Sequence, residues 1–384
     1  SWRFIMSKIN VRSFSNENED GAPDIVGVST FSATSYFVPT RGTTAQRPSD
    51  HVESGSIRFN TDTKNLEYYR GKTIGWSQFE LIDPDLGGGT GSNTGLGTRM
   101  LAGGGDTPSY VNNIDFLTIS TFGDAQDFGD LTTASTGAGG SASRTRGLFT
   151  NRRVSGSPAY TNEIDFVTIA STGNAQDFGD STLANGYNRA LSSQIRSLGL
   201  AYSSVNTINY VTIATTGNAV DFGDQTGVLE GGAACASSTR GVLAGGGNLA
   251  NIDFVTIMTT GNAQDFGDLS AAATGGTGLS NSTRGVFKIG FQSSKTNAME
   301  FITIATKSNS TDFGDAVNLS YSLASGASPT RGIFAGGSAP SSPYPRTNVI
   351  QKIEILTTGN AVDFGDLTFG SSHPAGLTNG HGGL

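Results

Sequence analysis

The tetrapeptide Asp-Phe-Gly-Asp recurs along most of this chain, and the repeat constrains the fold more than any other feature. Its six copies begin at Asp127, Asp177, Asp221, Asp265, Asp312 and Asp363. Successive copies lie 44 to 51 residues apart, a period typical of β-propellers and similar arrays of one supersecondary unit. Because a reaction centre is rarely needed six times in one chain, the motif indicates architecture and not catalysis.

Each repeat predicts strands separated by tight turns. In one repeat, residues 252–257 are rich in Ile, Phe, Val and Thr, as strands are, and their nearly continuous apolar character suits a strand buried on both faces. Gly261 and Asn262 follow and supply the positive φ angles of a hairpin turn. No segment shows a long apolar pattern at helical spacing with caps, so the sequence predicts an all-β fold whose motif phenylalanines fill the space between sheets.

A second recurring element, Thr-Arg followed in most copies by Gly, sets the phase of the repeats. It occurs at Thr98, Thr145, Thr239, Thr283 and Thr330, with a degenerate copy at Ile195. No copy follows Asp366, so the last sheet lacks a strand that residues 97–104 can supply. We therefore predict a closed ring in which the N-terminal and C-terminal segments share one sheet, because closure removes exposed edges.

The repeat resembles the kelch pattern. The run 242–246 (Val-Leu-Ala-Gly-Gly) is followed by an apolar strand, a turn and a strand that carries Phe266 where kelch repeats usually have Trp. The resemblance covers residues 97–384 and implies four-stranded blades. It predicts a six-bladed kelch-like β-propeller preceded by a small β-rich N-terminal attachment domain.

The segment before the repeats differs in composition and contains no repeat. Residues 1–86 carry more charge, residues 87–96 form a Gly-rich linker, and the repeats occupy residues 97–384. Two short strands at 57–60 and 66–69, with Trp76 near a third, make too small a core to be stable alone. We therefore expect this domain to pack against another chain or another domain.

This small domain strongly resembles a module of tail-fibre and other structural proteins of bacteriophages, especially cyanophages. The matching residues are 43–48 (Thr-Thr-Ala-Gln-Arg-Pro), 55–63 (Gly-Ser-Ile-Arg-Phe-Asn-Thr-Asp-Thr), 66–69 (Leu-Glu-Tyr-Tyr) and Trp76. The resemblance implies a virion protein, often trimeric, with this module on the particle side. The residues expected to make the attachment are Ile57, Phe59, Leu66, Tyr68 and Trp76.

The composition of the chain excludes several kinds of partner and binding site. The net charge is −8 with no long basic run, which argues against nucleic-acid binding because phosphate contacts need clustered Lys and Arg. Cys235 is the only cysteine, so an intrachain disulfide and a multi-Cys zinc site are excluded. The sequence shows neither a secretory signal nor a membrane-spanning stretch, and we expect assembly in the host cytoplasm into a virion.

The recurring charged residues suggest two kinds of site. The arginines of the Thr-Arg element can form an anion-binding ring, but we favour contacts of each arginine with a carbonyl or an aspartate of a neighbouring strand. The repeated aspartates can in principle hold calcium, although they flank Phe-Gly and do not form a dense ligand loop. No catalytic triad or paired-carboxylate pattern stands out, so we expect no enzymatic activity and no cofactor.

The variable connections are stronger candidates for recognition, because recognition usually lies on loops held by a rigid scaffold. Residues 150–162, 288–297 and 338–348 form the longest of them, and all leave the same kind of strand end, so they should cluster on one face. Tyr and Arg are favoured in binding hot spots, which gives the candidates Arg152, Arg153, Tyr160, Tyr344 and Arg346. The alternative is that these loops are solvated insertions without a partner.

These observations predict a non-enzymatic, homo-oligomeric phage protein, such as a trimeric tail fibre or receptor-binding appendage. Its N-terminal domain would bind other virion proteins, and its propeller would bind a glycan or protein of the host surface. One alternative is a capsid or collar decoration without a receptor role. Another is a carbohydrate-active depolymerase, whose carboxylates can come from distant parts of a chain.

Overall fold

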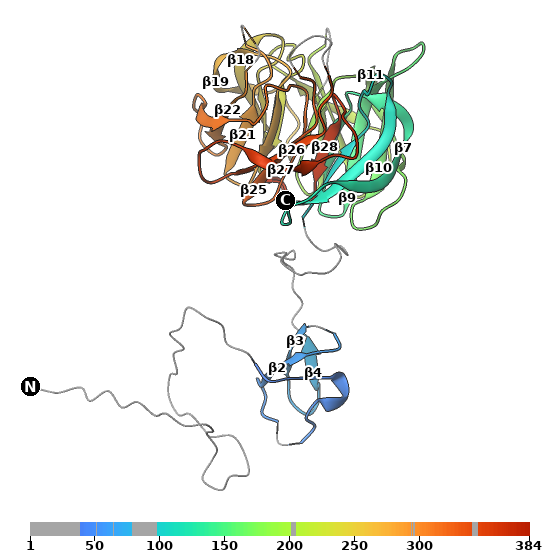
Figure 1. Ribbon diagram of the computed structural model, residues 1–384, viewed down its shortest axis with the longest axis vertical. Coiled ribbons are helices and arrows are strands. Elements are labelled where there is room, and N and C mark those ends of the chain that lie inside the picture. Colours follow the sequence, from blue (N-terminus) through green and yellow to red (C-terminus); the bar gives the residue numbers. More distant parts are fainter. Residues whose placement is uncertain are drawn as a thin grey trace, which may run out of the picture. The chain divides into compact units, whose positions relative to one another are not determined.

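The computed structural model of the chain divides into two compact units, residues 1–83 and residues 84–384. It describes residues 39–50, 52–63, 65–78, 98–200, 205–292, 294, 296–339 and 345–384, and the predicted linker at 87–96 lies outside these ranges. Apart from the short 3₁₀ helix η1 (Thr44–Gln46), the regular elements of the described residues are strands (Figure 1). The prediction of an all-β chain is confirmed for this part of the sequence.

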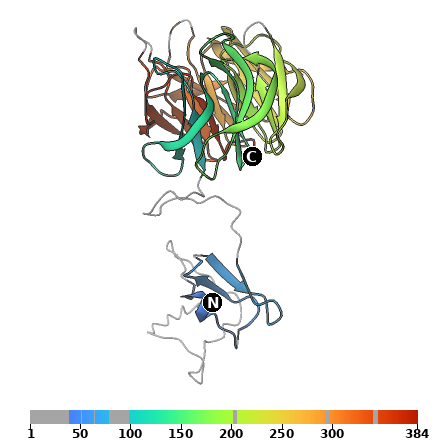
Figure 2. The ribbon, with the colours of Figure 1, turned by 90° about the vertical axis from the view of Figure 1, so that its right-hand side faces the viewer.

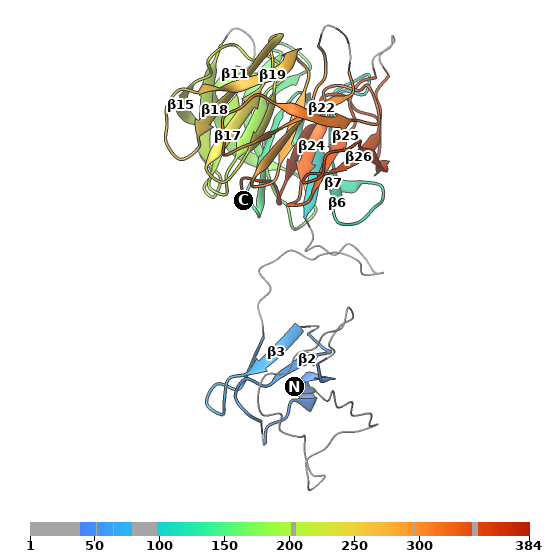
Figure 3. The same cartoon turned by 90° about the vertical axis from the view of Figure 1, so that its left-hand side faces the viewer.

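The first unit contains one four-stranded sheet. Its strands, in spatial order, are β1 (Arg41–Gly42), β2 (Ile57–Asn60), β3 (Asn65–Tyr69) and β4 (Trp76–Gln78) (Figure 3). β1 runs parallel to β2, and the other neighbours are antiparallel. Trp76 packs at 5.3 Å between ring centroids against Tyr69 and donates its indole N–H to the carbonyl of Pro48 at 3.1 Å. Trp76 therefore ties the last strand to the chain that precedes the sheet.

The two central strands of this sheet bury polar side chains and leave apolar ones partly in solvent. Glu67 is fully buried, and its carboxylate accepts hydrogen bonds from Arg47 and, at 2.7 Å, from Asn60. The bond from Arg47 holds the pKa of Glu67 below its usual value despite burial. On the other face, Ile57 is 52% exposed and Leu66 is 41% exposed. This distribution inverts the usual pattern of a half-buried sheet.

The described residues of the second unit form six antiparallel repeats of four strands each. Repeats 1 and 2 contain β28 (Ala375–Thr378), β5 (Arg99–Gly103), β6 (Val111–Thr118) and β7 (Gln126–Thr136), then β8 (Gly139–Ala142), β9 (Arg146–Val154), β10 (Tyr160–Thr168) and β11 (Gln176–Asn185). Repeats 3 and 4 contain β12 (Arg189–Ser192), β13 (Arg196–Leu200), β14 (Thr207–Thr212) and β15 (Val220–Asp224), then β16 (Ala233–Ala236), β17 (Arg240–Ala244), β18 (Leu249–Thr256) and β19 (Gln264–Ala273). Repeats 5 and 6 contain β20 (Thr277–Ser280), β21 (Arg284–Lys288), β22 (Ala298–Thr303) and β23 (Thr311–Asp315), then β24 (Ala324–Ala327), β25 (Arg331–Ala335), β26 (Val349–Glu354) and β27 (Val362–Asp366).

The sheets are arranged in a propeller-like way (Figure 2). Repeats 3 to 6 are separate four-stranded sheets. Repeats 1 and 2 merge into one eight-stranded sheet, because the end of β7 pairs with β9 through Ser135–Val154 and Thr136–Arg153. The first strands β8, β12, β16, β20, β24 and β28 each contact the next one around a circuit that returns to β8. They therefore form the inner wall of a ring.

The two ends of the repeat region share one sheet. β28, near the end of the chain, pairs with β5, near its start, from Ala375–Gly103 to Thr378–Met100. This pairing confirms the prediction that the two ends share one sheet. The prediction that residues 97–104 complete the last sheet is wrong in detail, because β24 to β27 form a complete sheet and the C-terminal strand β28 completes the first one. Because β5 gains a partner on its inner side, no unpaired inner edge is left at this position.

The Asp-Phe-Gly-Asp motif joins each repeat to the next one through its main chain. Between repeats 2 and 3, the carbonyl of Phe178 accepts from Gly217 N–H at 2.8 Å, and Asp180 N–H donates to the side-chain oxygen of Asn218 at 3.1 Å. The corresponding N–H to side-chain bonds are Asp130–Asn174, Asp224–Asn262, Asp268–Asn309, Asp315–Asn360 and Asp366–Asp124. The last of these runs from repeat 6 back to repeat 1. The motif glycine is required because a Cβ on Gly179 would lie 2.6 Å from the carbonyl of Gly217.

The phenylalanines and arginines of the repeat also act between neighbouring sheets. Phe128 is 2% exposed and belongs to a cluster that contains Val167 and Ile169 of the next repeat, as predicted. Arg146 donates to the carbonyl of Ile213 at 2.9 Å. Equivalent pairs are Arg99–Ile169, Arg196–Ile257, Arg240–Ile304, Arg284–Ile355 and Arg331–Ile119. The favoured prediction, that these arginines contact neighbouring carbonyls, is confirmed.

Candidate binding site at one mouth of the ring

The connections between second and third strands bring several predicted recognition residues together. Arg153 donates to the Tyr187 hydroxyl at 2.9 Å, and its guanidinium lies 6.0 Å from the ring centre of Tyr110. Asp106, which forms a bridge with Tyr110, pairs with Arg346 at 2.9 Å. The connections of repeats 1, 2 and 6 therefore meet on one face of the ring, which we call the loop face.

The other predicted recognition residues differ in their exposure. Arg152 is fully buried and forms ion pairs with Glu163 at 2.6 Å and Asp165 at 2.7 Å, so its side chain has no surface to offer a partner. Tyr160 is 36% exposed at the start of β10. Tyr344 lies outside the described residues. The sequence reveals an arginine in a variable connection but not that two acids on the neighbouring strand β10 pair with it and help to bury it.

A ring of left-handed residues surrounds the mouth on the loop face. One such residue stands two positions before each first strand, with φ between 54° and 68°. The six are Gly137, Tyr187, Gly231, Gly275, Ser322 and His373. Neighbouring members are linked by main-chain hydrogen bonds of 3.0–3.2 Å, which are His373–Ser322, Ser322–Gly275, Gly276–Gly231, Asn188–Gly137 and Gly137–His373. Glycine adopts this conformation at little cost, whereas other residues are strained in it.

The three non-glycine members project side chains where the other repeats have none. Tyr187 meets His373 edge to face at 5.0 Å, and Tyr321 lies 6.5 Å from His373 and 4.5 Å from Phe291 between ring centroids. These aromatic side chains, together with Arg189, Glu230 and Ser322, line a cavity of about 350 Å³. No sequence pattern indicates this cavity, because its lining residues lie far apart in the chain, from Tyr187 to His373.

Arg189 lies in the wall of this cavity and closes the one gap in the hydrogen-bonded ring. Its guanidinium donates to the carbonyls of Gly232 at 3.0 Å, Asn188 at 3.1 Å and Gly276 at 3.2 Å. These bonds use three of the five N–H groups that an arginine side chain carries. Burial lowers the pKa of Arg189 to about 10, so Arg189 stays cationic at neutral pH, while the three carbonyls that accept its hydrogen bonds are uncharged.

His373 is neutral under the same conditions. Burial, together with the positive charges of Arg189 and Arg346, lowers the pKa of His373 to about 3. A neutral imidazole adds polar and aromatic surface to the mouth without adding charge. The electrostatic character of the mouth is therefore set by Arg189 on the inside and by Glu230 at the exposed rim.

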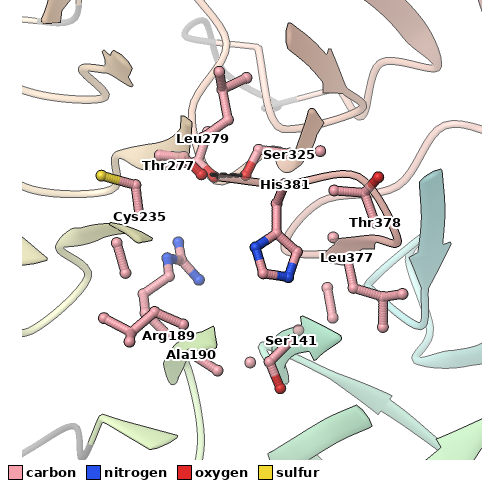
Figure 4. Close-up of a pocket in the computed structure, with 18 of the residues that line it drawn as sticks. Ser141, Arg189, Ala190, Cys235, Thr277, Leu279, Ser325, Leu377, Thr378 and His381 are labelled. Atoms are coloured by element: carbon pink, nitrogen blue, oxygen red, sulfur yellow. Dashed lines mark hydrogen bonds between the residues drawn. The ribbon is translucent and has the colours of Figure 1, made fainter. Parts of the chain in front are cut away.

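A second, smaller cavity lies on the axis of the ring (Figure 4). It measures about 80 Å³ and is lined by the first strands, including Ser141, Thr277 and Ser325. This volume holds several water molecules. Arg189 borders both cavities, so it separates the axial cavity from the mouth on the loop face.

The C-terminal residues close the other end of the axial cavity. His381 donates from Nε2 to the carbonyl of Ala142 at 2.8 Å, and its Nδ1 accepts from Gly383 N–H at 3.1 Å. Gly382 N–H donates to Ser280, across the ring, at 2.9 Å. Burial lowers the pKa of His381 to about 4, although the hydrogen bond to the Ala142 carbonyl acts in the opposite direction. The sequence did not predict this role for the tail.

The part of the chain that the structure describes offers few other metal-binding or reactive groups. There, no group of three or more His, Cys, Asp or Glu side chains is placed to hold a metal ion. Burial raises the pKa of the Cys235 thiol to about 12, which makes it a poor nucleophile. No helix among the described residues has the length and apolar character to cross a membrane. Neither a protein-family model nor a curated protein sequence matches the chain.

Proposed function

We propose that this protein is a non-enzymatic structural protein of a phage virion, a tail fibre or receptor-binding appendage that attaches to the host surface. In this proposal the six repeats are the blades of a kelch-like β-propeller, closed by the pairing of β28 with β5. The observation that carries the proposal is the loop face, where connections from several repeats surround an open, aromatic mouth. The repeated residues hold the ring together, which leaves the variable ones for recognition.

The resemblance of the first unit to a tail-fibre module supports the proposal that the protein belongs to a virion. Ile57 pairs with Tyr68, and Phe59 pairs with Leu66, so all four side chains share one face of the sheet. Ile57 and Leu66 are largely exposed, and the opposite face is taken up by the buried Glu67 network. Burying this apolar face against further copies of the chain, as in a trimer, or against another virion protein gains hydrophobic free energy.

A decoration protein without a receptor role would need a stable ring but no open mouth. A depolymerase would need an acid and a base or nucleophile beside the bound sugar. Glu230 is the acid that lines the mouth cavity in the described part of the chain, and one carboxylate is not sufficient for that chemistry. The geometry of the mouth therefore favours binding over both alternatives.

Virions assembled with a chain that ends at residue 86 test the proposal directly. We expect them to assemble and to lose most of their adsorption to host cells, while virions with the full chain adsorb normally. Adsorption that does not depend on the ring would refute the attachment function. Release of reducing sugar ends from host polysaccharide by the purified protein would instead support the depolymerase.

A further inference from the structure

The residues that break the symmetry of the repeats converge on the mouth of the ring. The first residue of the first strand is Gly139, Ala233, Thr277, Ala324 or Ala375 in five repeats and Arg189 in repeat 3. Two positions before the first strand, repeats 3 and 1 carry Tyr187 and His373, where three others carry glycine. The other repeats close without a large side chain at these positions, so ring closure alone does not account for Tyr187, Arg189 and His373.

The backbone at these positions is strained. A non-glycine residue in the left-handed region costs about 1–3 kcal/mol, and Tyr187, Ser322 and His373 have φ of 54°, 55° and 54°. Strain of this kind persists where a side chain serves a function. All three side chains line the mouth cavity, so the function lies in what that cavity holds.

The charge of the mouth favours an anion. The described acceptors of Arg189 are main-chain carbonyls, which satisfy N–H groups but leave the positive charge without a counter-charge. An opposite charge stabilises a partly buried charge when the two groups meet in good hydrogen-bond geometry. Carboxylates suit a guanidinium particularly well, because two oxygens match two N–H groups.

The shape and lining of the mouth favour a sugar over a simple ion. Its volume of about 350 Å³ falls in the range of small-molecule sites. Tyr187, Phe291 and Tyr321 offer apolar ring surfaces, while Ser322 and Thr274 offer hydroxyl groups. Glu230 at the rim can accept hydrogen bonds from hydroxyl groups of a ligand but repels a second negative charge. Together these groups fit a ring with one carboxylate, several hydroxyls and an apolar C–H face.

We propose that the mouth binds a carboxylate-bearing sugar residue of a surface polysaccharide, with the carboxylate on Arg189 and the sugar ring against the aromatic side chains. This inference rests on the proposed attachment function and specifies its ligand. The sugar enters from the loop face, since the C-terminal tail occupies the other end of the axial cavity.

Isothermal titration calorimetry of the full chain with trigalacturonate and with its trimethyl ester tests the charge requirement. The two ligands have the same rings, and only the first carries carboxylates. We expect trigalacturonate to bind at least about 10-fold more tightly, as charge-assisted hydrogen bonds predict. Arg189→Met should reduce its affinity to that of the ester. The matched control is Arg144→Met, which removes an exposed arginine from the β8–β9 turn and should change nothing.

A second variant keeps the test decisive if Arg189→Met does not fold. Tyr321→Leu should weaken both ligands by about 2- to 10-fold through loss of ring contact, whereas Phe122→Leu, on a 61% exposed side chain outside the cavity, should not. Equal affinity for acid and ester, or binding of neither, overturns the inference. If neither binds but adsorption still requires the ring, attachment stands and the sugar site falls. If the acid binds through Arg189 but ring-less virions adsorb normally, the attachment function falls instead.

Discussion

Replacing Gly365 with alanine should break the contact that closes the ring between repeats 6 and 1. Gly365 has φ of +157°, and a Cβ there would lie 2.5 Å from the carbonyl oxygen of Gly123. Gly359, in the same repeat, also has φ of +157°, but nothing lies within 4 Å of its Cβ position. Both variants share the backbone strain of about 1–3 kcal/mol, so their difference isolates the contact with repeat 1.

The additional loss of stability in Gly365→Ala comes from the groups that the new methyl group displaces. The Gly123 carbonyl has to retreat by nearly an ångström, which costs about 1–3 kcal/mol when packed groups are displaced. The same movement weakens the bonds from Ala125 N–H to Asp366 at 2.8 Å and from Asp366 N–H to Asp124 at 3.0 Å, each worth about 1 kcal/mol. Gly365→Ala should therefore be less stable than Gly359→Ala by about 3 kcal/mol, or about 6 °C in Tm.

Guanidinium titration and scanning calorimetry of the two variants measure this difference. Hydrogen exchange of residues 119–126 locates it, because the amides of Gly123 and Ala125 both donate to repeat 6. Equal stability of the two variants, with unchanged exchange in this segment, would mean that repeats 6 and 1 do not touch there. The closed ring would then be refuted.

Three further predictions concern His381, Ser322 and the strand β28, which lie around the axial cavity and its mouth. The pKa of His381 is about 4 in the folded chain and 6.5 in the unfolded one, so below pH 6.5 the unfolded state takes up the proton and stability falls. On going from pH 7.5 to 5.0 the wild type should lose about 2 kcal/mol more than His381→Gln, measured by denaturant titration. Ser322→Gly should change the free energy of unfolding by less than about 1 kcal/mol, because relief of strain offsets the entropy gained by the unfolded chain; a larger loss would show that Ser322 is not strained. A chain ending at Pro374 lacks β28, and light scattering should show it aggregating through the exposed edge of β5.

The sequence predicted the parts of the fold that are repeated. The spacing of Asp-Phe-Gly-Asp indicated six similar units, and the missing copy of Thr-Arg after Asp366 predicted that the two ends share one sheet, as the pairing of Ala375 with Gly103 shows. The contact of Arg146 with a neighbouring carbonyl was also among the predictions. Each of these follows from a pattern that appears several times, so one local interaction explains every copy.

The features that sequence could not predict depend on contacts that occur once. Arg152 stands in a variable connection like a recognition residue, but Glu163 and Asp165 on the neighbouring strand bury it. Tyr187 and His373 gave no sign of a left-handed backbone, because glycine is the residue that signals it. His381 lies in a Gly-rich tail, which has no strand or turn pattern to show that it crosses the ring.

The contrast between repeated and unrepeated residues supports a division of roles in this protein. A residue found in all repeats, such as the motif glycine, contributes to closure, and its substitution should lower stability. A residue found in one repeat, such as Tyr321, can serve the ligand, and even Arg189 is replaced by small residues in the other repeats. If this division holds, Tyr321→Leu changes ligand affinity with little effect on Tm, whereas Gly365→Ala changes Tm with little effect on affinity. Arg189→Met should change affinity and also lower Tm, because it removes three hydrogen bonds to main-chain carbonyls. A rigid ring can then vary its ligand by changing one or two blades while the remaining ones keep it closed.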